Sequence, residues 1–251
     1  MELLVYKRVG ETTAELSNRI KQEQNASKVA ICGKLDPMAR GLTRALTNEK
    51  TKLMSTYLTN NKTYEFKLVF DIKTDTDDIM GRILSYNHSQ NTCSRMEVYK
   101  SYINEICQYD EQHFHPFSAI KLTIDGKRQS LHQWTKERNM NLTNLPKKKV
   151  TVLEKEFGDL QTINFNSYKS NIDDRLSKIN QSHKSTFRVD EIQNCWNEFV
   201  GISTSIDMTH LVILPIKLRV SSGFYIRMLP YYLKEIYGVN SHIYDIHRTH
   251  C

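Results

Sequence analysis

The chain has 251 residues, of which 39% are hydrophobic and 25% are charged, a balance typical of a globular protein rather than a disordered chain. Its formal net charge of +7 suits a polyanionic partner such as RNA or DNA, without selecting one. No apolar run is long enough to span a membrane, and the N-terminus has no secretory signal pattern. Five scattered cysteines form no C-x-x-C pair, so we expect free thiols in a reducing intracellular compartment, with the cytoplasm favoured.

In the first third of the chain, short strands and helices are predicted to alternate. We expect a strand over 3–6, a helix capped at Thr12 that ends near residue 24, and a short apolar run over 28–32. Leucine and methionine spacing predicts one helix face over 42–58. The clearest strand is 62–70, because its aromatic and aliphatic residues alternate with polar ones.

The remaining elements are predicted from hydrophobic periodicity and turn residues. We expect a strand from residue 82, helices over 96–108, 131–138, 189–199 and 221–233, a hairpin turn at 125–127, and strands over 150–153, 211–214, 216–220 and 242–248. Residues 164–188 are rich in Ser, Asn and Lys, which predicts a long loop or insertion there.

Two polar segments invite a metal interpretation that we do not favour. The acidic segment 74–78 fails the EF-hand pattern, so we expect a polar turn that pairs with basic groups. His113 and His115 alternate in an extended segment, but no third ligand stands nearby, so we expect surface histidines. The chain also has no Gly-rich phosphate loop, and no cofactor or metal is expected.

The segment Gly33–Gly41, GKLDPMARG, sets Asp36 on a turn between two glycines. The proline after Asp36 restricts the turn, and Lys34 and Arg40 on either side attract polyanions and favour the ionised carboxylate. An ionised carboxylate held in this way can act as a nucleophile. The alternative is an ordinary Asp-Pro turn in which the side chain accepts a backbone hydrogen bond.

Five separated segments match or resemble motifs of one known family, in the same order along the chain. They are Gly33–Gly41 against G-x-L-D-P-x-A-x-G, Lys62–Tyr64 against K-x-Y, Lys73–Gly81 against T-D-T-x-D-x-x-G, Pro116–Arg128 against P-x-Y-S-A-x-K…G-K-R, and Ser222–Arg227 against S-K-G-T-Y-I-R. Together they resemble the TruB-type pseudouridine synthases, which include the tRNA pseudouridine(55) synthases and dyskerin. The resemblance covers nearly the whole chain.

The resemblance implies a role for each matching residue. Asp36 lies where the family has its catalytic aspartate, and Tyr64 where it has a tyrosine that stacks on the target base. Arg227 matches the arginine that pairs with the aspartate, and Asp78 the carboxylate that steadies this arginine. In the family, the positions of Tyr225 and Ile246 close the pocket around the base. Without the resemblance, Tyr64 would be interpreted as a core aromatic and Arg227 as a helix-surface residue.

The fold implied is a single α+β pseudouridine synthase domain over 1–251, in which a central mixed, mostly antiparallel sheet lies among helices around an RNA-binding cleft. We expect no C-terminal PUA domain, a monomer, and an isomerase that flips a uridine out of RNA, the T-loop uridine of tRNA first, without a small-molecule cofactor. Candidate phosphate contacts are basic residues spread along the chain: Lys34, Arg40, Lys62, Lys121, Lys127, Arg128 and Arg248.

One departure from the family pattern keeps other functions open. The family usually has Gly-His where this chain has Ala30 and Ile31, and isoleucine cannot donate a hydrogen bond or stack like imidazole. A non-catalytic RNA-binding or RNA-folding protein on the same scaffold is therefore the first alternative. A glycosidase that uses Asp36 and Asp78 as paired carboxylates is the second, and it requires Asp78 to be separate from Arg227.

Overall fold

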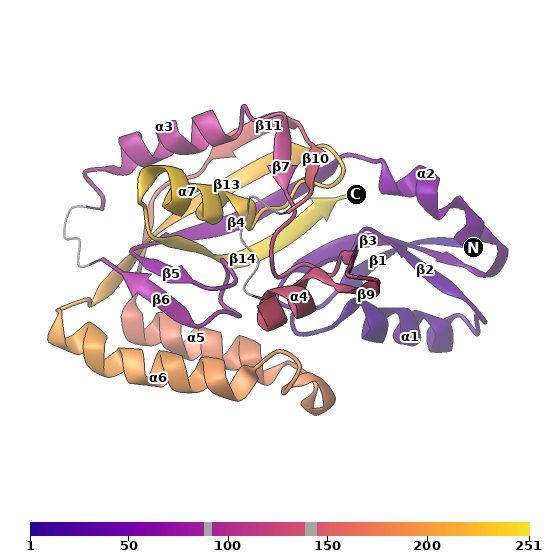
Figure 1. The fold of residues 1–251 in the computed structure, drawn as a ribbon, viewed down its shortest axis with the longest axis horizontal. Coiled ribbons are helices and arrows are strands. Elements are labelled where there is room, and N and C mark those ends of the chain that lie inside the picture. Colours follow the sequence, from indigo (N-terminus) through magenta and orange to yellow (C-terminus); the bar gives the residue numbers. More distant parts are fainter. Residues whose placement is uncertain (88–91, 139–144) are drawn as a thin grey trace.

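The computed structural model describes residues 1–87, 92–138 and 145–251, and a curved mixed sheet forms its centre (Figure 1). In order across the sheet, the strands are β1 (Glu2–Lys7), β3 (Arg40–Thr47), β14 (Ser241–His250), β4 (Lys62–Phe70), β13 (His210–Val220) and β11 (Val152–Phe157). In addition, β2 (Val29–Cys32) pairs with β3, and β12 (Gln161–Asn164) pairs with β13. The β3–β14 pair is parallel and the other pairs of this sheet are antiparallel, so the predicted α+β class and sheet type are confirmed.

Helices and small hairpins surround this sheet (Figure 1). The α-helices are α1 (Thr13–Glu23), α2 (Met54–Leu58), α3 (Met96–Ile106), α4 (Leu131–Arg138), α5 (Phe165–Ser177), α6 (Val189–Ser205) and α7 (Met228–Tyr237), and 3-10 turns cover Asn48–Leu53 and Gln181–His183. The small two-stranded sheets are β5 (Ile72–Thr74) with β6 (Ile83–Tyr86), β7 (Glu111–His113) with β10 (Lys147–Lys149), and β8 (Lys121–Ile124) with β9 (Lys127–Ser130).

Strand β4 organises the largest hydrophobic cluster. Tyr64, Phe66 and Leu68 alternate along it and are buried, while Glu65 between them is exposed. They pack with residues of α3 and α7, which lie on the same side of the sheet (Figure 1). A second cluster joins α5 and α6 to the sheet, and a third joins α1 to β2 and β3. The predicted strand over 62–70 is therefore confirmed, with its alternation set by this core.

The predicted helix face over 42–58 is wrong in its first half. Residues 40–47 form β3, which pairs with β1 on one edge and with β2 and the end of β14 on the other. Only Met54–Leu58 is α-helical, after the 3-10 turn. The leucines at 42 and 46 fit a helical spacing by sequence alone, but pairing with three strands overrides that weak local preference.

The predicted loop over 164–188 is also wrong, because α5 occupies most of it. The Asn164 side chain accepts hydrogen bonds from the backbone N–H groups of Asn166 and Ser167 and so caps the helix. Phe165, Tyr168, Ile172 and Leu176 form its buried face. Polar residues fill the exposed face of this helix, and their number concealed a regular apolar spacing.

Two smaller differences concern the end of the chain. The strands predicted over 211–214 and 216–220 form one continuous strand, β13, that passes through Pro215. The helix predicted from residue 221 begins only at Met228, because residues 221–227 form turns that lead into α7. Arg227 therefore lies at the first turn of α7 rather than on an exposed helix face.

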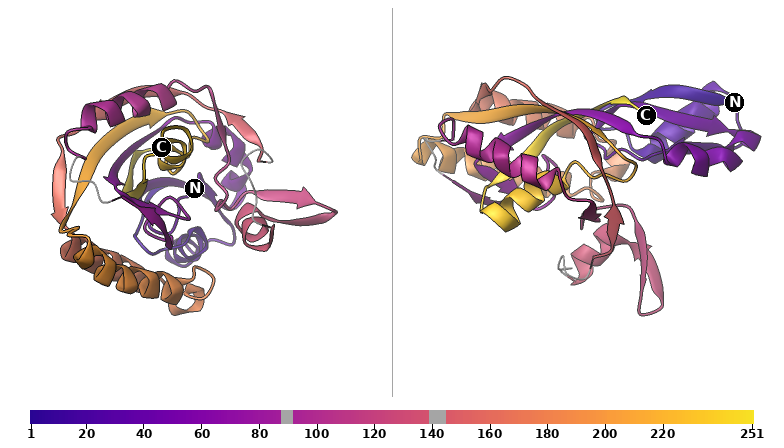
Figure 2. Two further views of the ribbon diagram at one scale, coloured as in Figure 1. Left: turned by 60° about the vertical axis from the view of Figure 1, so that its left-hand side comes forward. Right: turned by 90° about the horizontal axis from the view of Figure 1, so that it is seen from above.

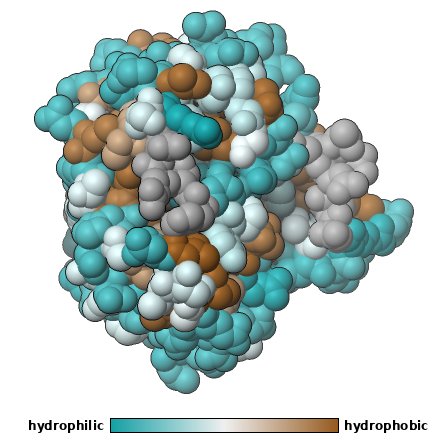
Figure 3. Space-filling model, turned by 90° about the vertical axis from the view of Figure 1, so that its left-hand side faces the viewer, coloured by the Kyte–Doolittle hydropathy of each residue, from teal (hydrophilic) through white to brown (hydrophobic). Residues whose placement is uncertain are grey.

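The helices and one face of the surface can be described by their hydropathy. None of the helices within the described ranges is long and apolar enough to cross a bilayer. Figure 3 shows that hydrophilic residues cover most of one end of the molecule, with smaller hydrophobic areas between them.

Gly41→Ala tests the close approach of β3 to β14. Gly41 has φ of +123°, and an added Cβ would lie 2.2 Å from the backbone oxygen of Arg248. We expect a loss of about 2–5 kcal/mol of unfolding free energy in urea titrations, because backbone strain and overpacking add. Gly201→Ala in α6 is the control: nothing lies near its added Cβ, and it should gain about 0.5–1 kcal/mol. Equal stability of both variants would contradict the prediction.

Candidate active site

The Asp36 turn connects β2 to β3 and is anchored by the backbone around it. The Ala39 N–H donates to the Asp36 carbonyl at 3.0 Å and closes the turn. Gly33 enters it with φ of +92°, a conformation that L side chains rarely adopt. The Gly10 N–H donates to the Pro37 carbonyl at 2.9 Å and ties the turn to the segment after β1.

Two buried cations hold the carbonyl groups of this turn. Lys7 Nζ donates to Pro37 O at 3.1 Å and to Ala39 O at 2.7 Å. Arg248 Nη2 donates to Gly33 O at 3.1 Å. Both cationic side chains are 1% exposed, so these bonds lie in a water-poor environment. Burial lowers the pKa of Lys7 to about 8, although the negative charge of Asp36 acts in the opposite direction.

Arg227 joins the Asp36 turn to the acidic turn after β5. Its Nε lies 2.9 Å from Asp36 Oδ2 and 3.6 Å from Asp78 Oδ2. The Asp36 side chain stays 40% exposed, whereas that of Arg227 is only 6% exposed. Burial opposes the charge of Arg227, but Asp36 and Asp78 outweigh it and raise the pKa of the guanidinium. The carboxylate that faces solvent is thus held by a fixed, buried cation.

The acidic segment 74–78 pairs with basic groups, as predicted. Asp75 pairs with Arg188 at 2.9 Å, and Asp78 is held by Arg227. Burial raises the pKa of Asp78 to about 6, although Arg227 acts against this. The Thr76 hydroxyl and the Met80 N–H both donate to Asp78 Oδ1, at 2.6 and 2.9 Å. Asp78 is therefore a buried support for Arg227.

Asp36 and Arg227 line two neighbouring cavities. The first, which we term the Tyr64 cavity, has a volume of about 430 Å³ and is also lined by Tyr64, Tyr225 and Ile246. The neighbouring strands β4 and β14 supply Tyr64 and Ile246, which lie two residues apart in the register of the pair. Burial, and then the charge of Asp36, raise the pKa of Tyr225 to about 12, so its hydroxyl stays protonated at neutral pH. An apolar, aromatic cavity beside a carboxylate suits a planar ring.

The second cavity, which we term the Phe117 cavity, has a volume of about 570 Å³ and shares Asp36 with the first. Phe117, Lys136 and Arg188 contribute to its wall. The Arg188 guanidinium lies 5.3 Å from the centre of the Phe117 ring. Ile31 lines both cavities, so the pair provides a continuous apolar surface with cations at its margin.

The candidate phosphate contacts divide into four groups. Lys34 lines both cavities and is the candidate that best fits this role. Lys62 and Arg248 line the Tyr64 cavity, but their charged groups donate to backbone carbonyls, as Lys62 does to Leu58 O at 3.0 Å. Arg40 is not beside Asp36, because it pairs with Asp245 at 2.9 Å and lines a different pocket.

The remaining candidates lie on the β8–β9 hairpin, outside both cavities. Lys121 is on β8, and Lys127 and Arg128 are on β9. The hairpin and α4 project from the body of the molecule (Figure 2). A small cluster that includes Leu131 and Trp134 packs this unit together. Any contact of these three cations would therefore be with a ligand that extends well beyond Asp36.

A comparison with family models matches residues 21–166 to the TruB family of pseudouridylate synthases, N-terminal domain. The chain belongs to this TruB family. A relative named tRNA pseudouridine synthase B from Aquifex aeolicus is 35% identical over 127 residues, which is 50% of this chain and 42% of that protein. Its namesake from Corynebacterium jeikeium is 25% identical over 98% of this chain and 65% of its own length. The chain thus spans less than two thirds of either relative.

The fold is similar to a solved structure as well. A chain in the crystal structure of a Cbf5–Nop10–Gar1 complex superposes with a TM-score of 0.53 and 13% identity. The superposition covers 99% of this chain and 47% of the other. Since the identity is low, this similarity concerns the fold alone. It agrees with the α+β pseudouridine synthase architecture that the TruB motifs imply.

The structure adds residues to the site that the sequence did not single out. His115 is fully buried next to Arg227, so the expectation of a surface histidine is wrong. Lys7 lies just outside the strand predicted over 3–6, although it binds the Asp36 turn. The aromatic and proline neighbours of His115 were the available signal, because Phe114 and Phe117 mark a packed segment. No comparable signal in the sequence distinguishes Lys7 from a surface lysine.

The geometry also bears on the two alternative functions, a glycosidase and a non-catalytic RNA-binding protein. Arg227 contacts both Asp36 and Asp78, and Asp78 is buried, so the two acids are not free to act as a glycosidase pair. Ile31 packs into the apolar cluster with Leu16 and Ile20 and presents no hydrogen-bonding side chain to either cavity. The departure from the TruB pattern at Ile31 therefore leaves an aliphatic side chain at this position of both cavities.

Lys7→Met removes the titrating group of Lys7, so a comparison with wild type shows the contribution of that group to stability. In the folded protein its pKa is about 8, against 10.5 for an unperturbed lysine, so between these values the unfolded chain binds more protons. Unfolding free energy should therefore rise with pH across this window by up to about 3 kcal/mol in the wild type relative to the variant. Urea unfolding at several pH values tests this, with Lys52→Met, an exposed lysine, as the control for loss of one charge. Parallel curves for wild type and Lys7→Met would contradict it.

Proposed function

We propose that this chain isomerises uridine to pseudouridine in RNA, with the T-loop uridine of tRNA as its substrate. The observation that carries the proposal is the Asp36 carboxylate, held by Arg227 at 2.9 Å where the two cavities meet. Membership of the TruB family supports the reaction. The names of the relatives, tRNA pseudouridine synthase B, support tRNA as the RNA.

The reaction needs a nucleophile, a way to hold the detached base, and no redox change. In our proposal Asp36 attacks the ribose or the base of the target uridine, and the glycosidic C–N bond breaks. The uracil then rotates within the cavity and rejoins the ribose through a ring carbon while the bond to Asp36 breaks. That carbon loses its proton and the nitrogen that left the ribose gains one, so the product has the composition of the substrate. Arg227 keeps the carboxylate in one orientation, which favours attack from a defined direction.

The Tyr64 cavity suits a base that has left its stack. Tyr64, Tyr225 and Ile246 provide the aromatic and aliphatic surface that a flipped base requires. The adjoining Phe117 cavity leaves room for the nucleotides next to the target. Lys34, which lines both cavities, suits a phosphate, and binding should therefore weaken as salt increases. The free cysteines support a reducing compartment as the site of action.

The alternative function, RNA binding without catalysis, is favoured by one observation. Ile31 occupies the position at which the TruB pattern has histidine, and it is 7% exposed within an apolar cluster. A chain with this aliphatic side chain binds RNA by the same surface but lacks the group that the family uses to displace the base. The retained contact of Asp36 with Arg227 favours catalysis over this alternative.

Asp36→Asn tests the reaction itself. The amide is a poor nucleophile of nearly the same shape, so we expect at least about a 1,000-fold loss of pseudouridine formation with folding and RNA binding retained. Purified protein is incubated with an unmodified tRNA transcript, and pseudouridine is mapped chemically. Glu65→Gln is the control, since it removes a carboxylate from β4 on the exposed side of the sheet.

Three results separate the possibilities. A T-loop pseudouridine made by wild type and Glu65→Gln, and absent with Asp36→Asn, supports the proposal in full. A second incubation uses total cellular RNA, and pseudouridine formed there but not in the transcript supports the reaction and contradicts the tRNA substrate. Salt-sensitive RNA binding without pseudouridine in either sample overturns the proposed enzymatic activity and supports the non-catalytic alternative.

A further inference from the structure

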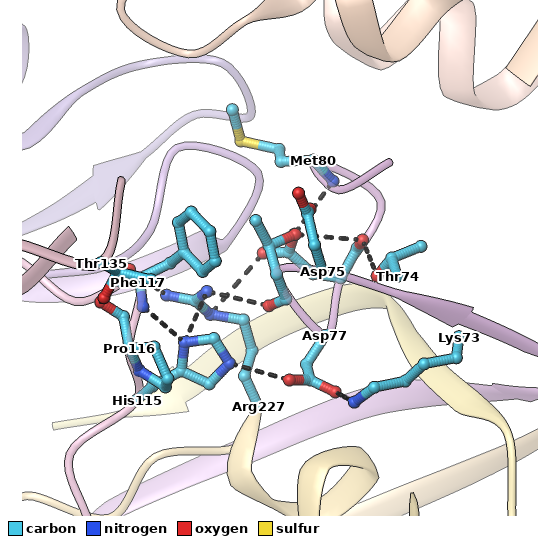
Figure 4. A network of polar contacts seen from close by, with 12 residues as sticks. Lys73, Thr74, Asp75, Asp77, Met80, His115, Pro116, Phe117, Thr135 and Arg227 are labelled. Atoms are coloured by element: carbon cyan, nitrogen blue, oxygen red, sulfur yellow. Dashed lines mark hydrogen bonds and ion pairs between the residues drawn. The ribbon is translucent and has the colours of Figure 1, made fainter. Parts of the chain in front are cut away.

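His115 is fully buried and contacts Nη1 of Arg227, whereas Asp36 contacts Nε of the same guanidinium. Its Nδ1 is 3.3 Å from Arg227 Nη1 and 3.1 Å from the backbone nitrogen of Phe117 (Figure 4). Both neighbours are donors, because a guanidinium and a backbone N–H have no acceptor. Nδ1 must therefore carry a lone pair rather than a hydrogen.

The other ring nitrogen faces an acid. His115 Nε2 lies 3.0 Å from Asp77 Oδ2, and Asp77 Oδ1 binds Lys73 Nζ (Figure 4). The side chains of Asp77 and Lys73 are 3% and 8% exposed. A carboxylate in this position accepts the hydrogen of Nε2 and so fixes the tautomer that Nδ1 requires. The chain Lys73–Asp77–His115–Arg227 is therefore consistent in the direction of every hydrogen.

Burial and the neighbouring charge of Arg227 keep the His115 ring neutral. Burial lowers the pKa of His115 to about 4, and Arg227 acts in the same direction. Asp77 and Asp36 act against this without reversing it. The opposite protonation state would place an N–H against the Arg227 guanidinium. At neutral pH, His115 is thus available as an uncharged acceptor.

Neither His115 nor Asp77 is a residue that the TruB motifs described above prescribe. Asp77 occupies a variable position of T-D-T-x-D-x-x-G, and when P-x-Y-S-A-x-K is aligned on Ser118, Ala119 and Lys121, histidine stands at position 115 in place of the first proline of the motif. The motif residues Asp36 and Asp78 lie at Nε of the Arg227 guanidinium. The network at Nη1 includes His115 and Asp77, which the TruB motifs do not prescribe.

We propose that His115, held by Asp77 as the Nε2–H tautomer, is a positioning residue that fixes the Arg227 guanidinium and through it the Asp36 carboxylate. The proposal rests on the proposed function, because its kinetic test needs a turnover to measure. Arg227 Nη1 has two acceptors, Thr76 O and His115 Nδ1, and Nη2 has Phe117 O. Loss of the His115 acceptor leaves the guanidinium less constrained, and small displacements of reacting groups lower rates strongly.

Asp77→Asn reverses a hydrogen in this network while keeping its shape. If the new amide turns its oxygen to Lys73, its N–H₂ donates to Nε2 and moves the ring hydrogen to Nδ1, against Arg227 Nη1. If it turns the other way, its N–H₂ opposes the Lys73 ammonium. We expect kcat to fall about 100-fold. The KM for RNA should stay within about threefold of wild type, since the network does not line the RNA surface.

The double variant Lys73→Gln/Asp77→Asn restores the direction of the hydrogens. The glutamine carbonyl accepts from the new amide N–H₂, so the amide oxygen again accepts from Nε2–H. We expect kcat to recover at least about tenfold over Asp77→Asn, whereas a purely structural role predicts that the second buried change lowers it further. Lys73→Gln alone completes the double-mutant cycle, and thermal unfolding shows that the variants are folded.

Nitrogen NMR of protein with ¹⁵N-labelled histidine reads the tautomer without any turnover. His115→Asn identifies the His115 signals among those of the nine histidines. We expect the neutral Nε2–H form from about pH 8 down to about pH 5.5, and the Nδ1–H form in Asp77→Asn. Titration of His115 in this range, or an Nδ1–H form in wild type, overturns the proposal.

The two readouts keep this proposal separate from the proposed function. If wild type makes no pseudouridine, the function fails, and the NMR result still decides the tautomer. If wild type is active and Asp77→Asn keeps full kcat, or the double variant does not recover, the positioning role fails although the function stands. The expected set is reduced kcat, unchanged KM, recovery in the double variant, and the Nε2–H signal.

Discussion

The contact between Arg227 and Asp36 is the interaction on which the rest of the site depends. It joins a turn near one end of the chain to the start of α7, 191 residues further on. A buried guanidinium is stable only if acceptors surround it, and Asp36, Thr76, His115 and Phe117 provide them from three separate segments. Asp36, whose carboxylate reaches solvent, is therefore oriented by the buried groups that hold Arg227.

Some elements of the fold could be predicted from the sequence and others could not. Strand β4 was predicted with its correct bounds, because its alternation reports burial on one face directly. Strand β3 was mistaken for a helix, since two leucines fit a helical spacing and two of its strand partners, β1 and β14, lie far away in sequence. Helix α5 was missed because polar composition was given more weight than the spacing of Phe165, Tyr168 and Ile172.

The residues of the site also include some that the sequence predicted and some that it did not. Asp36, Asp78 and Arg227 could be assembled from short motifs whose chemistry is visible in sequence, and the structure brings them together. Lys7 and His115 could not, because what matters is a bond from a buried side chain to a distant backbone or guanidinium group. The spacing of residues in a sequence reports local geometry, whereas such bonds are set by how separate segments pack.

The parallel pairing of β14 with β3 has a consequence for how the site comes into being. Arg248 of β14 holds Gly33 at the start of the Asp36 turn, and β14 also lies against β4 next to Tyr64. A chain in which this strand has not yet docked can have most of its secondary structure and still lack a shaped pocket. The Tyr64 cavity thus depends on β14 lying between β3 and β4, so a chain without that strand in place lacks the cavity whatever helices it has formed.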